Sequence, residues 1–239
     1  MIIDVDRLNR LDLDCEINSD KKYYTFLAKK DKIDFIYNTS ALEGNSMTYP
    51  EVQTLLEGIT VGGRKLSDEQ MILNQNRSVE LLFELIKTNK FKIDKETFCK
   101  LNFEVSKEES LKWGEFRDGN VNIGGTEYKP PHFKELDKIF DSKIEKIKKI
   151  ENPIIKAFIF FLFGAKMQFF YDGNKRTSRL MMNGILLDNG YPILNIKAKD
   201  RLEFNSKMIE FYESIEPINT VLYLFNYYKK QNLNLRREL

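Results

Sequence analysis

The residues with the clearest chemical potential form one segment, from Gln168 to Arg179, between two stretches with helical patterns. Its sequence is Gln-Phe-Phe-Tyr-Asp-Gly-Asn-Lys-Arg-Thr-Ser-Arg. A polar turn that leads into a helix is a ready anion site, because the first helical turn presents unsatisfied backbone N–H groups and a partial positive charge. The segment therefore indicates a site for the phosphate groups of a nucleotide.

The backbone and the basic side chains of this turn suit a bound phosphate. Gly173 lets the backbone bend close to a ligand, and Asn174 tolerates unusual dihedral angles while offering an amide donor. Arg176 and Arg179 are three residues apart, so both guanidinium groups can flank one polyphosphate. Lys175 adds a neighbouring cation. These five residues are predicted to bind the nucleotide.

Asp172 is the acidic residue of the turn and the predicted metal ligand. Mg²⁺ typically takes only one or two carboxylates, with phosphate oxygens and water completing its shell. A second interpretation needs no ligand, because Asp-Gly-Asn is a common turn. In that case Lys175, Arg176 and Arg179 form the exposed face of a capped helix.

Gln168 lies at the end of a helix that is predicted to start at Asn152 and Pro153, a cap and a first-turn proline. It follows Phe161 by seven residues, so it is expected to point inward, toward the turn. A glutamine amide forms hydrogen bonds but has no usable pKa near neutrality, so it cannot remove a proton. Taken alone, it also fits a polar residue that a backbone group satisfies on a buried face.

Helical periodicity dominates the rest of the chain and predicts an all-α fold. Residues 33–41 place apolar side chains on one face of a helix, which Gly44 ends. Ser67–Gln70 has the spacing of a capping box before another helix. A further helix is expected to start near Asp94, and Asn189-Gly190 is expected to end the helix that carries the two arginines.

The pattern changes to short alternation with glycines between Trp113 and Pro131. It predicts a small β-hairpin or extended flap that a Pro-Pro pair closes. A lone hairpin is only marginally stable in water, so this one is expected to lie on the helical body. His132, the one histidine of the chain, follows the flap and is expected to be an ordinary surface residue.

The composition excludes several classes of protein. Lys and Arg total 38 against 36 Asp and Glu among 239 residues, a balance that gives no reason to expect nucleic acid or an anionic membrane as a partner. Cys15 and Cys99 are too few and too far apart for a disulfide framework or a zinc site. The most apolar stretch, 154–170, is interrupted by two lysines and is too short to span a membrane, and the N-terminus lacks a signal-peptide pattern. A soluble, cytoplasmic protein is expected.

Residues 168–179 resemble the motif of the Fic family, His-x-Phe-x-Asp/Glu-Gly-Asn-Gly/Lys-Arg-x-x-Arg. The match covers Phe170 and every defined position from Asp172 to Arg179, while Gln168 stands in place of the histidine. Thr39-x-x-x-Glu43-Gly44 resembles the inhibitory motif of the family, Ser/Thr-x-x-x-Glu-Gly/Asn.

A third segment looks like the flap of Fic proteins, the hairpin that aligns a target segment by strand pairing. Its residues are Val121, Asn122, Ile123, Gly124 and Gly125. Together the three resemblances cover roughly residues 30–205. They imply an all-α Fic-type core with one short β-hairpin, preceded by an N-terminal arm (1–30) and followed by a helical tail of the same domain (206–239).

The resemblance also implies roles for the turn. Fic proteins usually transfer AMP from ATP to a hydroxyl side chain of a target protein. By this resemblance Asp172 would hold Mg²⁺, Gly173 and Asn174 would cradle phosphate, Arg176 would hold the polyphosphate and Arg179 its terminal group. ATP, Mg²⁺ and a target protein are therefore the expected partners, and a homo-oligomer is left open.

Gln168 affects the expected transfer of AMP but not the expected binding of ATP. The histidine of the family deprotonates the target hydroxyl, and losing a general base typically costs about 10²–10⁴-fold in rate. Gln168 therefore predicts ATP binding with impaired or absent transfer. Glu43 continues an apolar helix face and needs a partner. The family resemblance supplies Arg179, which makes Glu43 inhibitory.

Three alternatives stay open on the sequence. Without a base, the chain can be a non-catalytic nucleotide-binding or interaction module. Lys175 is typical of the Doc-like branch, which transfers the γ-phosphate of ATP instead. Glu43 could also activate water to remove AMP from a modified protein.

Overall fold

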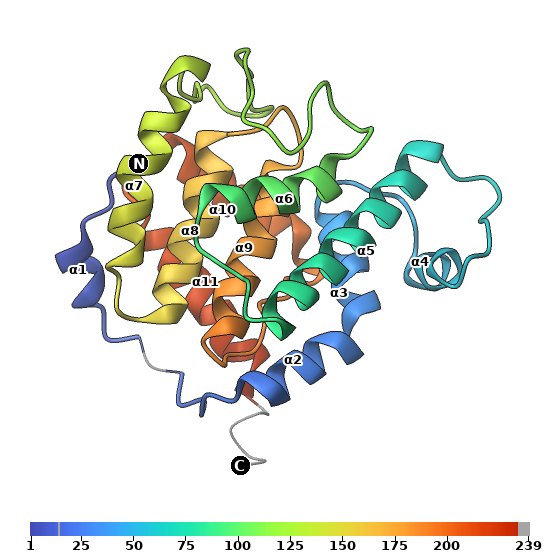
Figure 1. The fold of residues 1–239 in the computed structure, drawn as a ribbon, viewed down its shortest axis with the longest axis horizontal. Coiled ribbons are helices and arrows are strands. Elements are labelled where there is room, and N and C mark those ends of the chain that lie inside the picture. The colour runs from blue at the N-terminus through green and yellow to red at the C-terminus, as the bar shows by residue number, and fades with distance from the viewer. Residues whose placement is uncertain (14, 234–239) are drawn as a thin grey trace.

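Two helices, α8 (Pro153–Met167) and α9 (Asn174–Asp188), occupy the centre of the computed structural model (Figure 1). α8 begins as predicted, because the Asn152 side chain accepts hydrogen bonds from the first backbone N–H groups of the helix at 2.9 and 3.2 Å. Almost every side chain of α8 is buried. A helix that is apolar on all sides belongs in a protein core, and α8 is the centre of this one.

The structure describes residues 1–13 and 15–233, and the remaining helices surround the central pair (Figure 1). They are α1 (Val5–Asn9), α2 (Lys21–Lys30), α3 (Lys32–Leu42), α4 (Tyr49–Leu56), α5 (Leu66–Lys87), α6 (Lys95–Ser106), α7 (Leu136–Lys148), α10 (Arg201–Glu213) and α11 (Ile218–Gln231), with single 3-10 turns η1 (Phe133–Glu135) and η2 (Ala198–Asp200). The fold is helical, as predicted. None of the described helices is long and apolar enough to cross a bilayer.

Segments near both ends of the described chain pack onto this body. Leu8 and Tyr24, which precede residue 31, are buried. α10 runs across the 205/206 boundary without a break, and its Phe204 and Phe211 are buried in the core. α10 therefore packs against the core on both sides of that boundary.

Most of the predicted helix ends are confirmed. Gly44 follows the end of α3 with φ +93°, Asp94 caps α6 by accepting the Thr97 N–H at 2.8 Å, and Asn189 ends α9.

The predicted capping box at Ser67 is wrong. α5 starts one residue earlier, at Leu66, so Ser67 lies inside the helix. Contacts with a distant segment organise this turn instead: the Ser46 hydroxyl donates to Asp68 Oδ2 at 2.7 Å, and Asn45 Nδ2 donates to the Asp68 carbonyl at 2.9 Å. A capping box is present at the start of α4, formed by Thr48 and Glu51.

The predicted β-hairpin is also wrong. Residues 114–131 contain no strand and form loops over the end of the bundle where α8 passes into α9 (Figure 1). The five residues expected to form it lie in loop and turn: Val121, Asn122, Ile123, Gly124 and Gly125.

Arg117 organises the flap segment in place of a strand ladder. Its buried guanidinium donates to the carbonyls of Gly119 and Pro131, both at 2.6 Å, so it ties the two ends of the segment together. It also donates to the Gln168 carbonyl at 2.6 Å. One side chain thus satisfies backbone acceptors that a hairpin would pair across its strands.

Gly164 sets the distance between α8 and α9. A Cβ atom there would lie 2.1 Å from Ser178 Oγ and 3.2 Å from the Phe98 ring. The substitution Gly164→Ala improves helix propensity by about 1 kcal/mol, but overpacking a core costs about 1–3 kcal/mol. We expect a net loss of stability, measured as the free energy of unfolding in urea.

The double variant Gly164→Ala/Ser178→Ala is the matched control, because it removes the nearest clashing oxygen. It should recover part of the loss. A Gly164→Ala protein more stable than the parent would contradict close packing at this position.

Candidate active site

The turn between α8 and α9 contains two residues in the left-handed conformation. Gln168 follows α8 with φ +51°, and Gly173 precedes α9 with φ +73°. A Cβ atom on Gly173 would lie 2.4 Å from Ser106 Oγ and 2.7 Å from Val105 Cγ1, so glycine is required by space as well as by conformation. The backbone consequently folds tightly just before the first turn of α9, where unsatisfied N–H groups collect.

Asn174 closes this turn. Its amide exchanges hydrogen bonds with the backbone of Phe170, accepting from the N–H at 2.9 Å and donating to the carbonyl at 2.8 Å. It also donates to Gln168 Oε1 at 3.0 Å. Gln168 Nε2 in turn donates to the Ala165 carbonyl at 2.7 Å. Both ends of the glutamine amide therefore already have partners within the turn.

Two residues of α6 fix the backbone of Asp172. Asn102 Nδ2 and the Ser106 hydroxyl donate to its carbonyl at 3.2 and 3.0 Å. The carboxylate is free to face the cavity, because the side chain is 55% exposed. Its Oδ1 accepts the Gly173 N–H at 2.6 Å.

This arrangement fits a magnesium ion that binds together with phosphate. The described residues contain no group of three or more His, Cys, Asp or Glu side chains able to hold a metal ion by themselves. A single exposed carboxylate next to an anion site is nevertheless the protein contribution that Mg²⁺ typically receives when phosphate and water supply the other ligands.

Arg176 is almost completely buried, with 3% of its side chain exposed. Its NH1 lies 2.9 Å from Glu109 Oε2 and donates to the Val105 carbonyl at 3.2 Å, while NH2 lies 3.4 Å from Asp172 Oδ2. Glu109 is itself held by Asn74, whose amide donates to it at 2.5 Å. The first arginine of the turn is therefore fixed between two carboxylates.

Arg179 is more buried, with 1% exposed, and none of its three guanidinium nitrogens has a hydrogen-bond partner among the described residues. The group lies 5.8 Å from the centres of the Phe161 and Phe204 rings. Burial lowers the pKa of this guanidinium, against the opposing effect of the nearby Glu43. Because buried donors without acceptors are costly, Arg179 favours an acceptor-rich ligand here.

Glu43 reaches the site from the C-terminal end of α3. Its Oε2 lies 2.8 Å from Lys175 Nζ, and its Oε1 lies 3.6 Å from Arg179 NH2. The second distance gives an ion pair but exceeds hydrogen-bonding distance. Burial raises the pKa of the Glu43 carboxyl, but the charges of Lys175 and Arg179 outweigh burial and lower it overall. Glu43 is therefore held as a carboxylate.

The cavity at this turn is small, about 190 Å³, and Glu43 is part of its wall. Ligand pockets typically measure about 300–1,000 Å³. A second, more open cavity of about 550 Å³ shares Met71 and Asp172 with it. The two cavities together offer the space for a nucleotide that the inner one lacks.

The structure brings all the residues predicted for the turn to one place, together with the residues of the predicted inhibitory motif. Thr39 is buried on α3, one turn before Glu43. Gly44, at φ +93°, lets the chain leave the helix directly after the glutamate. His132 is exposed and accepts an N–H from Lys134, as expected for a surface residue.

Sequence reasoning missed the residues that support the site from other elements. Glu109, Arg117 and Asn102 lie 51 or more residues before the groups they hold in the turn. Glu109 and Arg117 follow α6, outside any helical pattern. The one local signal is on α6, where Asn102 and Ser106 are four residues apart and share a face.

The chain is similar in sequence to known proteins of one family. Residues 92–186 match the model of the Fic/DOC family. A protein named "Protein adenylyltransferase Fic" from Drosophila ananassae is 28% identical over 185 residues, which is 74% of this chain. The chain spans only 36% of that relative's length.

Solved structures show the same fold. A Fic domain containing signaling protein from Bacteroides thetaiotaomicron superimposes with a TM-score of 0.75 and 21% identity, covering 98% of this chain and 94% of the other. A fragment of Fic-1 from C. elegans gives a TM-score of 0.72 and 18% identity over 96% of this chain and 67% of the other.

The low pKa of Glu43 makes its ion pairs sensitive to pH. Its folded pKa is below the ordinary value of 4.5, so its contribution to stability is fully present above pH 4.5 and is lost as the pH falls through the folded pKa. Removing one partner of a buried pair costs roughly 3 kcal/mol. We expect Glu43→Gln to lower the free energy of unfolding by about this amount at pH 7 and by progressively less below pH 4.5.

Denaturant melts at several pH values measure this difference. The control is Glu145→Gln, which removes an exposed pair with Lys148 on α7 and should change little at any pH. A Glu43→Gln deficit that stays constant or grows in acid would contradict a buried, ionised Glu43.

Proposed function

Because the chain carries a Fic/DOC domain at residues 92–186, we propose that it is a nucleotide-binding Fic protein of the adenylyltransferase type. It binds ATP at the α8–α9 turn, with AMP transfer to a hydroxyl side chain of a target protein as the associated reaction. Transfer is impaired because Gln168 cannot act as a base, and it is restrained by Glu43.

The observation that carries this proposal is Arg179. Its side chain is 1% exposed, and its guanidinium lies beside a glycine turn at a helix N-terminus and has no hydrogen-bond partner within the part of the chain that the structure describes. Such a group is suited to the terminal phosphate of a polyphosphate. Glu43 Oε1 approaches it to 3.6 Å and so stands where that phosphate would bind. Both binding and restraint follow from this one contact.

The other residues of the turn would bind the remaining phosphate groups and the metal ion. The first-turn N–H groups of α9 and the Asn174 region would bind bridging phosphate oxygens, and Arg176 would add a fixed cation. Asp172 would hold Mg²⁺, which neutralises phosphate charge when bound. Gln168 would leave the incoming hydroxyl protonated, because an amide is not a base.

Four proteins test the proposal: the parent, Gln168→His, Glu43→Gly and the double variant. With ATP labelled on the α-phosphate, the double variant should label protein at least about 100-fold faster than the parent, since a general base contributes about 10²–10⁴-fold. ATP affinity measured by calorimetry should be similar for the parent and Gln168→His. It should rise in Glu43→Gly, because a competing carboxylate is removed.

Asp172→Asn in the double-variant background is the negative control and should abolish labelling. If γ-labelled ATP labels protein while α-labelled ATP does not, the reaction is Doc-like phosphoryl transfer and the proposal fails. Equal labelling by the double variant and by Glu43→Gly would show that the missing base is not what limits transfer. No ATP binding in any variant would remove the nucleotide site altogether.

A further inference from the structure

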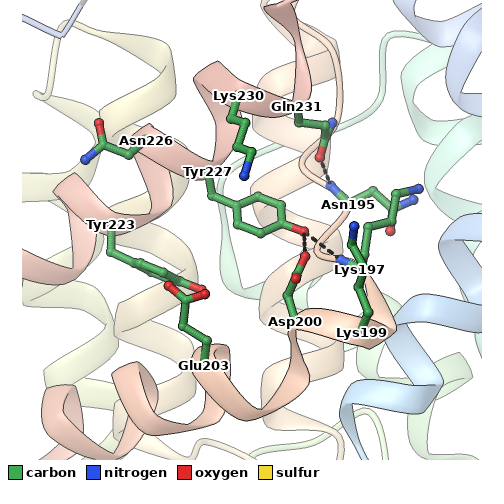
Figure 2. Close-up of a pocket in the computed structure, with 10 residues that line it drawn as sticks. All are labelled: Asn195, Lys197, Lys199, Asp200, Glu203, Tyr223, Asn226, Tyr227, Lys230 and Gln231. Carbon is green, nitrogen blue, oxygen red and sulfur yellow. Dashed lines mark hydrogen bonds between the residues drawn. The ribbon is translucent and has the colours of Figure 1, made fainter.

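A third cavity, of about 600 Å³, lies between α11, the start of α10 and the segment from Asn195 to Asp200 (Figure 2). It shares no lining residue with the two cavities at the α8–α9 turn. Its volume is typical of pockets for small molecules, about 300–1,000 Å³. The function proposed for the α8–α9 turn, called the Fic turn below, does not explain this cavity.

One wall of this cavity is built by hydrogen bonds. The Tyr227 hydroxyl donates to Asp200 Oδ2 at 2.6 Å and accepts the Lys197 N–H at 3.0 Å (Figure 2). Gln231 accepts the Asn195 N–H at 2.9 Å (Figure 2). The segment is therefore tied to α11 at two places, which makes the cavity preformed.

Several polar groups on the lining lack partners among the described residues. Asn195 is 6% exposed, and its Oδ1 is buried without a hydrogen bond. The hydroxyl oxygen of Tyr223 is also buried without a hydrogen bond. Lys199 and Lys230 form no ion pair with any described residue, although both line the cavity. The two lysines favour a ligand that carries a negative charge.

The tyrosines add a requirement for a flat apolar group. Figure 2 shows Tyr223 and Tyr227 extending from α11, with Glu203 beside Tyr223 and the lysines 197 and 199 on the opposite side. An anion is repelled near Glu203 and attracted near the lysines. The lining thus selects a molecule with an aromatic face and an anionic end.

We propose that this cavity binds a nucleoside monophosphate. Its phosphate pairs with Lys199 and Lys230, and its base lies against the tyrosine rings. Base–aromatic stacking and lysine–phosphate pairing are both established ways to bind nucleotides.

The cavity is connected to α3 through Asp34. Asp34 Oδ2 accepts hydrogen bonds from Lys197 Nζ at 2.5 Å and from Asn195 Nδ2 at 2.7 Å. Asn38, also on α3, accepts the Ala198 N–H at 2.9 Å. Lys197 lines the same cavity, so a phosphate held by Lys199 and Lys230 also attracts Lys197 away from Asp34. Occupancy thereby weakens the attachment of α3, the helix that directly precedes Glu43. This regulatory step rests on the proposed function, whereas the binding site does not.

Calorimetry with AMP, adenosine and inorganic phosphate tests the site. To weaken anion binding at the α8–α9 turn, the titrations use Lys175→Glu, a partly exposed position. AMP should bind this variant, and adding Lys230→Glu should weaken binding at least about tenfold by reversing a phosphate contact. Lys229→Glu, at the next position of α11 and outside the cavity lining, is the matched control and should change the affinity by less than about threefold.

No AMP binding at millimolar concentration overturns the proposal. So does equal weakening by Lys229→Glu and Lys230→Glu, which would reveal a diffuse charge effect, or inorganic phosphate binding as tightly as AMP, which would leave the tyrosines without a role.

Hydrogen exchange tests the connection to α3. In the parent protein AMP should accelerate amide exchange of residues 32–44 about threefold. The acceleration should persist in Lys229→Glu and disappear in Lys230→Glu. Acceleration that survives Lys230→Glu would assign the effect to the Fic turn and refute the connection. If ATP fails to bind the Fic turn while AMP binds the Lys175→Glu protein, the proposed function fails and the cavity proposal stands.

Discussion

The site depends on the need of buried cations for counter-charges. Arg176 and Arg179 are 3% and 1% exposed, and Lys175 stands next to them at the same helix N-terminus. Glu109 and Asp172 compensate the first arginine, while Glu43 serves both Lys175 and Arg179. The folded protein thus reaches approximate charge balance without a ligand. Under the proposed function, a polyphosphate would add negative charge to this balance. Glu43 is the carboxylate that it would displace, because Glu43 lies beside Arg179 and directly follows α3 instead of belonging to the α8–α9 turn.

This electrostatic arrangement requires unusual closeness of the central helices. Glycine at position 164 allows α8 to lie against α9 at Ser178, and glycine at position 173 allows the turn to lie against Ser106 on α6. The rings of Phe161 and Phe204 then enclose Arg179 in apolar surroundings. Because a low local dielectric strengthens each charge interaction, this packing strengthens the attraction between Glu43 and Arg179, with which a phosphate group would compete under the proposed function.

The sequence predicted what local rules control. The caps at Asn152 and Asp94, the end of α3 at Gly44 and the burial of α8 depend on neighbouring residues and are confirmed. It did not predict contacts between distant segments. Glu109 and Arg176 are 67 residues apart, and no periodicity connects them. The predictions of a hairpin and of a capping box at Ser67 were wrong for the same reason, because a contact with a distant segment overrides each local pattern. In the flap segment, Arg117 binds the Gln168 carbonyl at the end of α8. At the start of α5, Ser46 binds Asp68.

Gln168 is compatible with the turn because its side chain stabilises the turn through hydrogen bonds, which require no proton transfer. Its amide accepts from Asn174 and donates to the Ala165 carbonyl, so it joins the end of α8 to the start of α9 from a left-handed backbone position. A neutral imidazole also has one donor and one acceptor, but in a fixed ring geometry. Glutamine can therefore keep the turn closed while removing the base. Under the proposed function, phosphate binding needs this closed turn whereas transfer also needs a base, so binding and transfer would be separable properties of the same helix junction.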